Sequence, residues 1–157
     1  MPDVLSENIT KAFLIVLDET FNQVRGIYLD KGDSLFETLA TITAAEASVP
    51  VGGKCATLAA QVKHVAFYLD VVVQNVRDQQ YHKVDWGEIW RTVKQVTPEE
   101  WEQIQAELRV SYQAILQLLE GTTTWENEMQ IGGAMGMIAH TAYHLGEIRQ
   151  ALCTLRD

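Results

Sequence analysis

Apolar residues recur at intervals of three and four along most of the chain, a spacing typical of amphipathic helices. It predicts long helices over residues 6–27, 58–78, 98–120 and 129–155. Residues 33–47 predict one or two short helices that end at the 49–53 turn, and we expect these to cap the long ones. Four long helices with short additions indicate an all-α bundle. We expect one domain over residues 1–157.

Two of these helices have recognisable capping residues at their starts. Thr57 precedes the apolar stripe of the second helix and is a suitable N-cap. Thr97, Pro98 and Glu100 combine a Thr N-cap, Pro at the first helical position and a Glu that completes a capping box. Gly121 is expected to end that helix.

The last helix is apolar nearly all round, which predicts a central position in the fold. A helical wheel places His140 and His144 on the face opposite a stripe made of Ile131, Met135, Ile138, Ala142, Leu145 and Leu152. The glycines Gly132, Gly133 and Gly136 are expected to let neighbouring helices approach closely.

Residues 79–96 predict the longest irregular connection, and it is rich in tryptophan. It contains His82, Trp86 and Trp90. Because such a loop usually packs over something, we expect it to form either a structural lid or the wall of a pocket.

Charge and composition exclude several classes of protein. The chain of 157 residues has a net charge of −9 and no basic patch, which argues against a nucleic-acid partner. Residues 130–146 are uncharged but too few to span a membrane. The N-terminal residues lack the features of a signal peptide, and Cys55 and Cys153 do not form a disulfide framework. We therefore expect a cytoplasmic protein.

The histidines are the residues of this sequence that most strongly indicate a functional site. His140 and His144 lie one helical turn apart, so their imidazoles can converge on one metal ion. His64, on the second long helix, is the preferred third ligand, because a helix positions a side chain better than a loop; His82 is the alternative. A hydrogen-bonded histidine pair without metal is the competing interpretation.

Other helical metal motifs are absent. Thr141 follows His140, which excludes the zinc-protease motif, and no histidine has the glutamate that a di-iron bundle places three residues before it. Three nitrogen ligands would leave a coordination position open, as in catalytic sites. Glu147 is expected to be either an acceptor behind His144 or a surface charge.

The segment from Gly136 to Arg149, GMIAHTAYHLGEIR, resembles the closing H-x-x-x-H-x-G-x-[IL]-R pattern of the DinB-like (DinB/YfiT) metalloenzymes. His64 matches that family's histidine on its second long helix, and Asp85-Trp86, Trp90 and Glu100-Trp101 resemble its connection. The resemblance implies an up-down-down-up four-helix bundle, often a homodimer. It also implies that His64, His140 and His144 bind one divalent ion, commonly nickel or zinc.

The resemblance does not identify a reaction, because the family includes thiol-dependent S-transferases and hydrolases. Our first hypothesis is an enzyme whose metal site activates a low-molecular-weight thiol or water to attack a small electrophile. Trp86, Trp90 and Tyr68 are candidate pocket walls, and Glu147, Tyr143 and Tyr68 are candidate proton carriers. The alternative is a non-catalytic bundle in a dimeric interaction protein, in which the histidines bind metal for stability or bind each other.

Overall fold

The computed structural model describes residues 4–51 and 53–156, and the described chain is helical without strands. This confirms the predicted all-α class. Residues 1–3, which belong to the segment inspected for a signal peptide, and Gly52, in the predicted turn, lie outside the described residues. The helices are α1 (Val4–Phe21), α2 (Leu35–Leu39), α3 (Ala44–Ala47), α4 (Leu58–Asp78), α5 (Glu88–Thr92), α6 (Pro98–Glu120) and α7 (Glu128–Arg156), with a 3₁₀ turn at Gly53–Cys55.

The predicted caps are present at the starts of α4 and α6. The Thr57 hydroxyl accepts a hydrogen bond from the amide of Ala60 at 3.1 Å. Thr97 and Glu100 form the capping box, with Pro98 in the first turn. Because these signals depend only on neighbouring residues, the sequence is sufficient to fix both helix starts.

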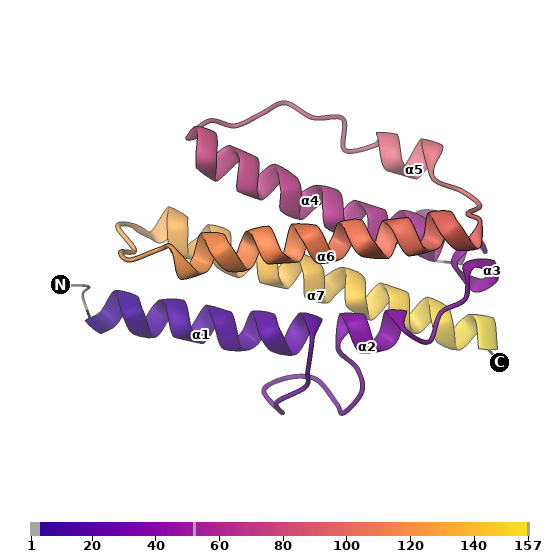
Figure 1. Ribbon diagram of the computed structural model, residues 1–157, viewed down its shortest axis with the longest axis horizontal. Helices are drawn as coiled ribbons and strands as arrows, with labels where there is room; N and C mark the ends of the chain where they lie inside the picture. The colour runs from indigo at the N-terminus through magenta and orange to yellow at the C-terminus, as the bar shows by residue number, and fades with distance from the viewer. Residues whose placement is uncertain (1–3, 52, 157) are drawn as a thin grey trace.

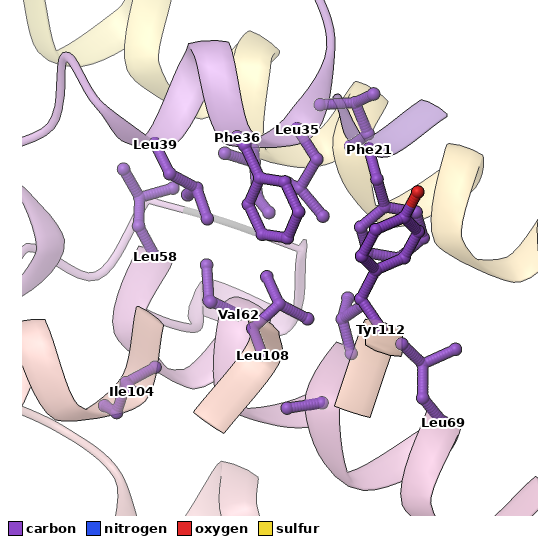
Figure 2. Packing of buried hydrophobic residues seen from close by; sticks show 14 of the residues in the cluster. Phe21, Leu35, Phe36, Leu39, Leu58, Val62, Leu69, Ile104, Leu108 and Tyr112 are labelled. Atoms are coloured by element: carbon purple, nitrogen blue, oxygen red, sulfur yellow. The ribbon is translucent and has the colours of Figure 1, made fainter. Parts of the chain in front are cut away.

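The long helices lie alongside one another, with α4 packed against α6 and α7, and α1 packed against α6 and α7. In Figure 1, α1 and α7 run from left to right, whereas α4 and α6 run from right to left. Figure 2 shows the part of the core that lies under α2, with Phe36 above Val62 and Leu108 and with Phe21 stacked against Tyr112. This packing fixes α4 and α7 as rigid supports for side chains between them.

The first helix is shorter than predicted, because α1 ends at Phe21 and not near Ile27. Ile27, expected on the core face, is 51% exposed. The buried Glu19 carboxylate accepts hydrogen bonds from the backbone amides of Arg25, Ile27, Tyr28 and Leu29. A loop folded around this carboxylate thus replaces the last two turns of the expected helix.

The buried face of α7 also differs from the prediction. Met135 was expected in the buried stripe but is 59% exposed, and α7 has a solvent-facing side, so it is not a central helix. The residues that are buried recur every three or four positions: Met137, Ile138, Thr141, His144, Leu145, Ile148, Ala151 and Leu152. The expectation for Gly132, Gly133 and Gly136 is likewise wrong, because a Cβ atom at any of them would meet nothing within 4 Å.

The connection between α4 and α6 is only partly irregular. Residues 88–92 form α5, and Ile89 on this helix packs against Ala56 and Ala60. The connection is therefore anchored to the start of α4. No helix in residues 4–51 and 53–156 combines the length and the apolar character that crossing a membrane requires.

Candidate metal centre

The helices α4 and α7 bring three imidazoles together. His64 comes from α4, and His140 and His144 come from successive turns of α7. One ring nitrogen from each residue lies within 4.8 Å of those of the other two, and the Nε2 atoms of His64 and His140 are 3.2 Å apart. The one-turn spacing of His140 and His144 therefore places both rings beside the same partner.

His82, the alternative third candidate, lies elsewhere. Its Nε2 atom is 2.7 Å from the Asp78 carboxylate, and its backbone amide donates a hydrogen bond to Asn75. The group of three contains His64 and not His82. The third imidazole beside the pair thus comes from α4 and not from the loop that follows it.

Two observations show that the three residues fit a shared metal ion. Two nitrogen ligands about 2.1 Å from one ion in a tetrahedral arrangement lie about 3.4 Å apart, close to the separation of the His64 and His140 Nε2 atoms. In addition, the Nδ1 atoms of His64 and His140 are buried and have no hydrogen-bond partner among the described residues. No group in the described part of the chain binds these two Nδ1 atoms, so each ring can carry its proton there and direct the Nε2 lone pair at an ion.

The protonation state of the rings also suits a metal. Burial lowers the pKa of His64 to about 4, and the charges of His144, His140 and Lys54 act in the same direction. Burial likewise lowers the pKa of His140 to about 4. Both imidazoles are therefore neutral at pH 7, with a lone pair free to bind a cation.

His144 is oriented by two acceptors on the far side of its ring. Its Nδ1 atom lies 2.7 Å from the Gln61 side-chain oxygen and 2.9 Å from the Glu147 carboxylate. A proton on Nδ1 satisfies both acceptors and leaves Nε2 with its lone pair. Burial lowers the pKa of His144, whereas Glu147 opposes that shift. Glu147 is thus an acceptor behind His144, which decides between the two roles considered for it.

Gln61 also belongs to this site, although it was not predicted. Gln61 is 1% exposed and precedes His64 by three residues, so the two side chains share a face of α4. The spacing of Gln61 one helical turn before a candidate ligand was the feature of the sequence that could have indicated this role. Its meaning depends on the approach of α7, which sequence spacing alone does not define.

Aromatic side chains enclose the histidines. The Tyr68 ring stacks on His140 with 3.7 Å between centroids, and the Trp90 ring lies 4.6 Å from that of His64. Together with Trp86 they line a cavity of about 490 Å³, which reaches the three histidines and has Tyr143 at its exposed rim. This volume lies in the range of small-molecule sites. The predicted pocket walls are therefore around the cluster.

A sequence model of the DinB superfamily matches residues 30–148. The match extends from the loop before α2 to most of α7 and includes all three clustered histidines. No curated protein and no solved structure matches the chain.

Proposed function

Because the chain belongs to the DinB superfamily, we propose that it is a metal-dependent enzyme acting on a small electrophilic substrate. The observation that carries this proposal is the group of three histidine nitrogens at the base of an aromatic-walled cavity. His64, His140 and His144 would hold the ion, and it would supply Lewis acidity toward a thiol or water. Neutral imidazoles suit zinc or nickel, which are the ions we expect.

The surrounding residues have definable tasks in such a site. Gln61 and Glu147 hold the proton of His144 on Nδ1. The Tyr143 hydroxyl shares the Glu147 carboxylate, and this hydrogen bond raises the pKa of Tyr143. Glu147, Tyr143 and Tyr68 line the same cavity and are the candidate proton carriers, whereas Trp86 and Trp90 restrict access of bulk solvent.

Two architectural features belong to the same proposal. The running directions of the four long helices in Figure 1 support an up-down-down-up bundle of the DinB type. We also propose a homodimer in solution, which light scattering coupled to size-exclusion chromatography would test. Neither feature is needed for the metal site itself, because one chain supplies all three histidines.

Metal analysis of protein purified without a histidine tag tests the metal site. We expect about one equivalent of a divalent transition ion per chain, and loss of that ion in a His140→Ala, His144→Ala double variant. A His82→Ala variant is the matched control and should retain the ion. Less than about a tenth of an equivalent after loading with zinc or nickel, unchanged in the double variant, would overturn the proposal.

Activity assays then separate an enzyme from a bundle that binds metal for stability alone. We expect the loaded protein to conjugate cysteine to chlorodinitrobenzene or to hydrolyse nitrophenyl acetate, and the double variant to do neither. Metal binding that raises the melting temperature, without turnover of either reagent, would contradict a thiol transferase or hydrolase. It would instead favour the structural alternative.

A further inference from the structure

A single cation lies at the mouth of the cavity. Lys54 is the one lysine or arginine among the described residues that line it. Its ammonium group is 5.8 Å from the centre of the Trp90 ring, which itself lies against His64. Lys54 is thus close to the histidine cluster in space, although it comes from the loop before α4.

The backbone holds Lys54 in an unusual conformation. Lys54 and Cys55 both have left-handed backbone angles, with φ of 58° and 52°. Each such non-glycine residue costs on the order of 1 kcal/mol. A β-bridge between Pro50 and Thr57 closes the loop, and Ala56 packs against Ile89 of α5. Strain of this kind, maintained by surrounding contacts, is common where a loop must present a side chain to a ligand.

Lys54 has no ion-pair partner among the described residues that line the cavity. Glu147 is the other formally charged residue among those lining it, and its carboxylate is engaged by His144 and Tyr143. In the described part of the chain, no carboxylate forms an ion pair with Lys54, and its ammonium group lies over the Trp90 ring. The protein as a whole has a net charge of −9, so this unpaired cation is a local exception.

We infer that the cavity takes a small molecule with a carboxylate on a flat apolar body, and that Lys54 binds the carboxylate. Trp86 and Trp90 supply flat surfaces for the body of such a ligand. The ammonium offers a charge-assisted hydrogen bond to the carboxylate at the mouth of the cavity. This inference rests on the proposed function for its reaction, since the same cavity reaches the histidines, but binding can be measured separately.

Benzoate and benzamide form a matched pair of probes, because they share size and ring but differ in charge. Their binding to chelator-treated protein can be followed by tryptophan fluorescence and calorimetry. We expect benzoate to bind about tenfold more tightly than benzamide. Lys54→Met should abolish this preference, and Lys54→Arg should retain most of it. Lys31→Met, in the exposed loop between α1 and α2, makes the same change in net charge outside the cavity and should have no effect.

Several results would overturn the inference: equal binding of both probes to the wild type, no binding of either, a preference that survives in Lys54→Met, or equal loss in Lys31→Met. Repeating the titrations with zinc-loaded protein separates this inference from the proposed function. If zinc binds but Lys54→Met leaves the preference intact, the Lys54 assignment alone fails. If zinc does not bind but the preference depends on Lys54, the metal site fails and the carboxylate site stands.

Discussion

Glu19 and the histidine cluster are two sets of buried polar groups in the same molecule, built in different ways. The Glu19 side chain is 0% exposed, and both of its oxygens accept hydrogen bonds from the loop that follows α1. His64 and His144 are also buried, with 7% and 6% of their surfaces exposed. Yet His64 and His140 each keep a ring nitrogen without a partner among the described residues.

The two sets of groups also differ in charge: Glu19 is ionised, whereas His64 and His140 are neutral. Burial alone would raise the pKa of Glu19, but four backbone amides hold it at about 2, so the carboxylate is charged and fully used. Burial lowers the pKa of His64 and His140 to about 4, so these rings are neutral at pH 7. Glu19, whose bonding is complete, serves the fold, whereas the Nε2 atoms of His64 and His140, 3.2 Å apart, either share a proton or share an ion.

The largest expected effect is the loss of stability when the Glu19 carboxylate is removed. Glu19→Ala leaves four amides of the loop without their acceptor. Each lost partner costs on the order of 1 kcal/mol, and the loop can relax toward water, so we expect the free energy of unfolding to fall by about 3 kcal/mol. Urea unfolding at pH 7 followed by circular dichroism measures this change.

The control for Glu19 is a carboxylate on the same helix that pairs only at the surface. Glu7 contacts Lys11 one turn away, and both side chains are exposed. Glu7→Ala should unfold at nearly the wild-type urea concentration. A Glu19→Ala variant as stable as Glu7→Ala would show that the loop does not depend on the carboxylate.

The second prediction concerns zinc binding to the histidine cluster. Zinc at a free concentration of about 100 times its dissociation constant should stabilise the wild type by about 2.7 kcal/mol, because it binds only the folded protein. His144→Ala should lose this gain and His82→Ala should keep it, since His82 is outside the group of three. Thermal unfolding with and without zinc measures the difference. Equal gains in His144→Ala and the wild type would place the bound ion elsewhere.

The two regions should also respond to acid in different pH ranges. The pKa of His64 and His140 falls from 6.5 to about 4 on folding, so the unfolded chain binds protons more readily and acid favours it. The full stability of the folded protein is therefore present above pH 6.5, and part of it is lost as the pH falls from 6.5 toward 4 and the histidines of the unfolded chain bind protons. Allowing for the coupling among His64, His140 and His144, we expect a loss of about 2 kcal/mol between pH 7 and pH 5 in metal-free protein.

Glu19 should contribute only at lower pH, because its pKa falls from 4.5 to about 2 on folding and its stabilisation is lost between those values. Urea unfolding at a series of pH values separates the two ranges. A His64→Leu, His140→Leu variant should show a flatter profile between pH 7 and pH 5. Wild-type stability that stays constant over this interval would contradict neutral, desolvated rings.

What could be predicted from the sequence follows from the range of the interactions involved. The starts of α4 and α6 were predictable because Thr57, Thr97 and Glu100 act on neighbouring amides. The end of α1 was not, because the Glu19 carboxylate draws amides from six to ten residues away. The buried face of α7 was assigned incorrectly because glycine, alanine and methionine on its exposed side make both faces similarly apolar.

The same distinction applies to the candidate site. The convergence of His140 and His144 follows from one helical turn, whereas the choice of His64 over His82 needed an argument about rigid elements and a family resemblance. Gln61 and Lys54 were missed because their contacts arise only when α4, α7 and the loop before α4 come together. Residues whose contacts at a site form between separate helices and loops cannot be recognised from the spacing of neighbouring residues.

The smallest expected effect concerns the acceptors behind His144. Gln61→Leu removes one of the two groups that hold its proton on Nδ1, and we expect zinc affinity to fall about tenfold, as measured by competition with a fluorescent chelator. Gln61→Glu, which keeps an acceptor oxygen, should lose less, and Gln103→Leu on the exposed side of α6 should lose nothing. If Gln61→Leu binds zinc like the wild type while Glu147→Ala does not, the carboxylate alone orients His144. The buried amide would then belong, like Glu19, to the fold and not to the site.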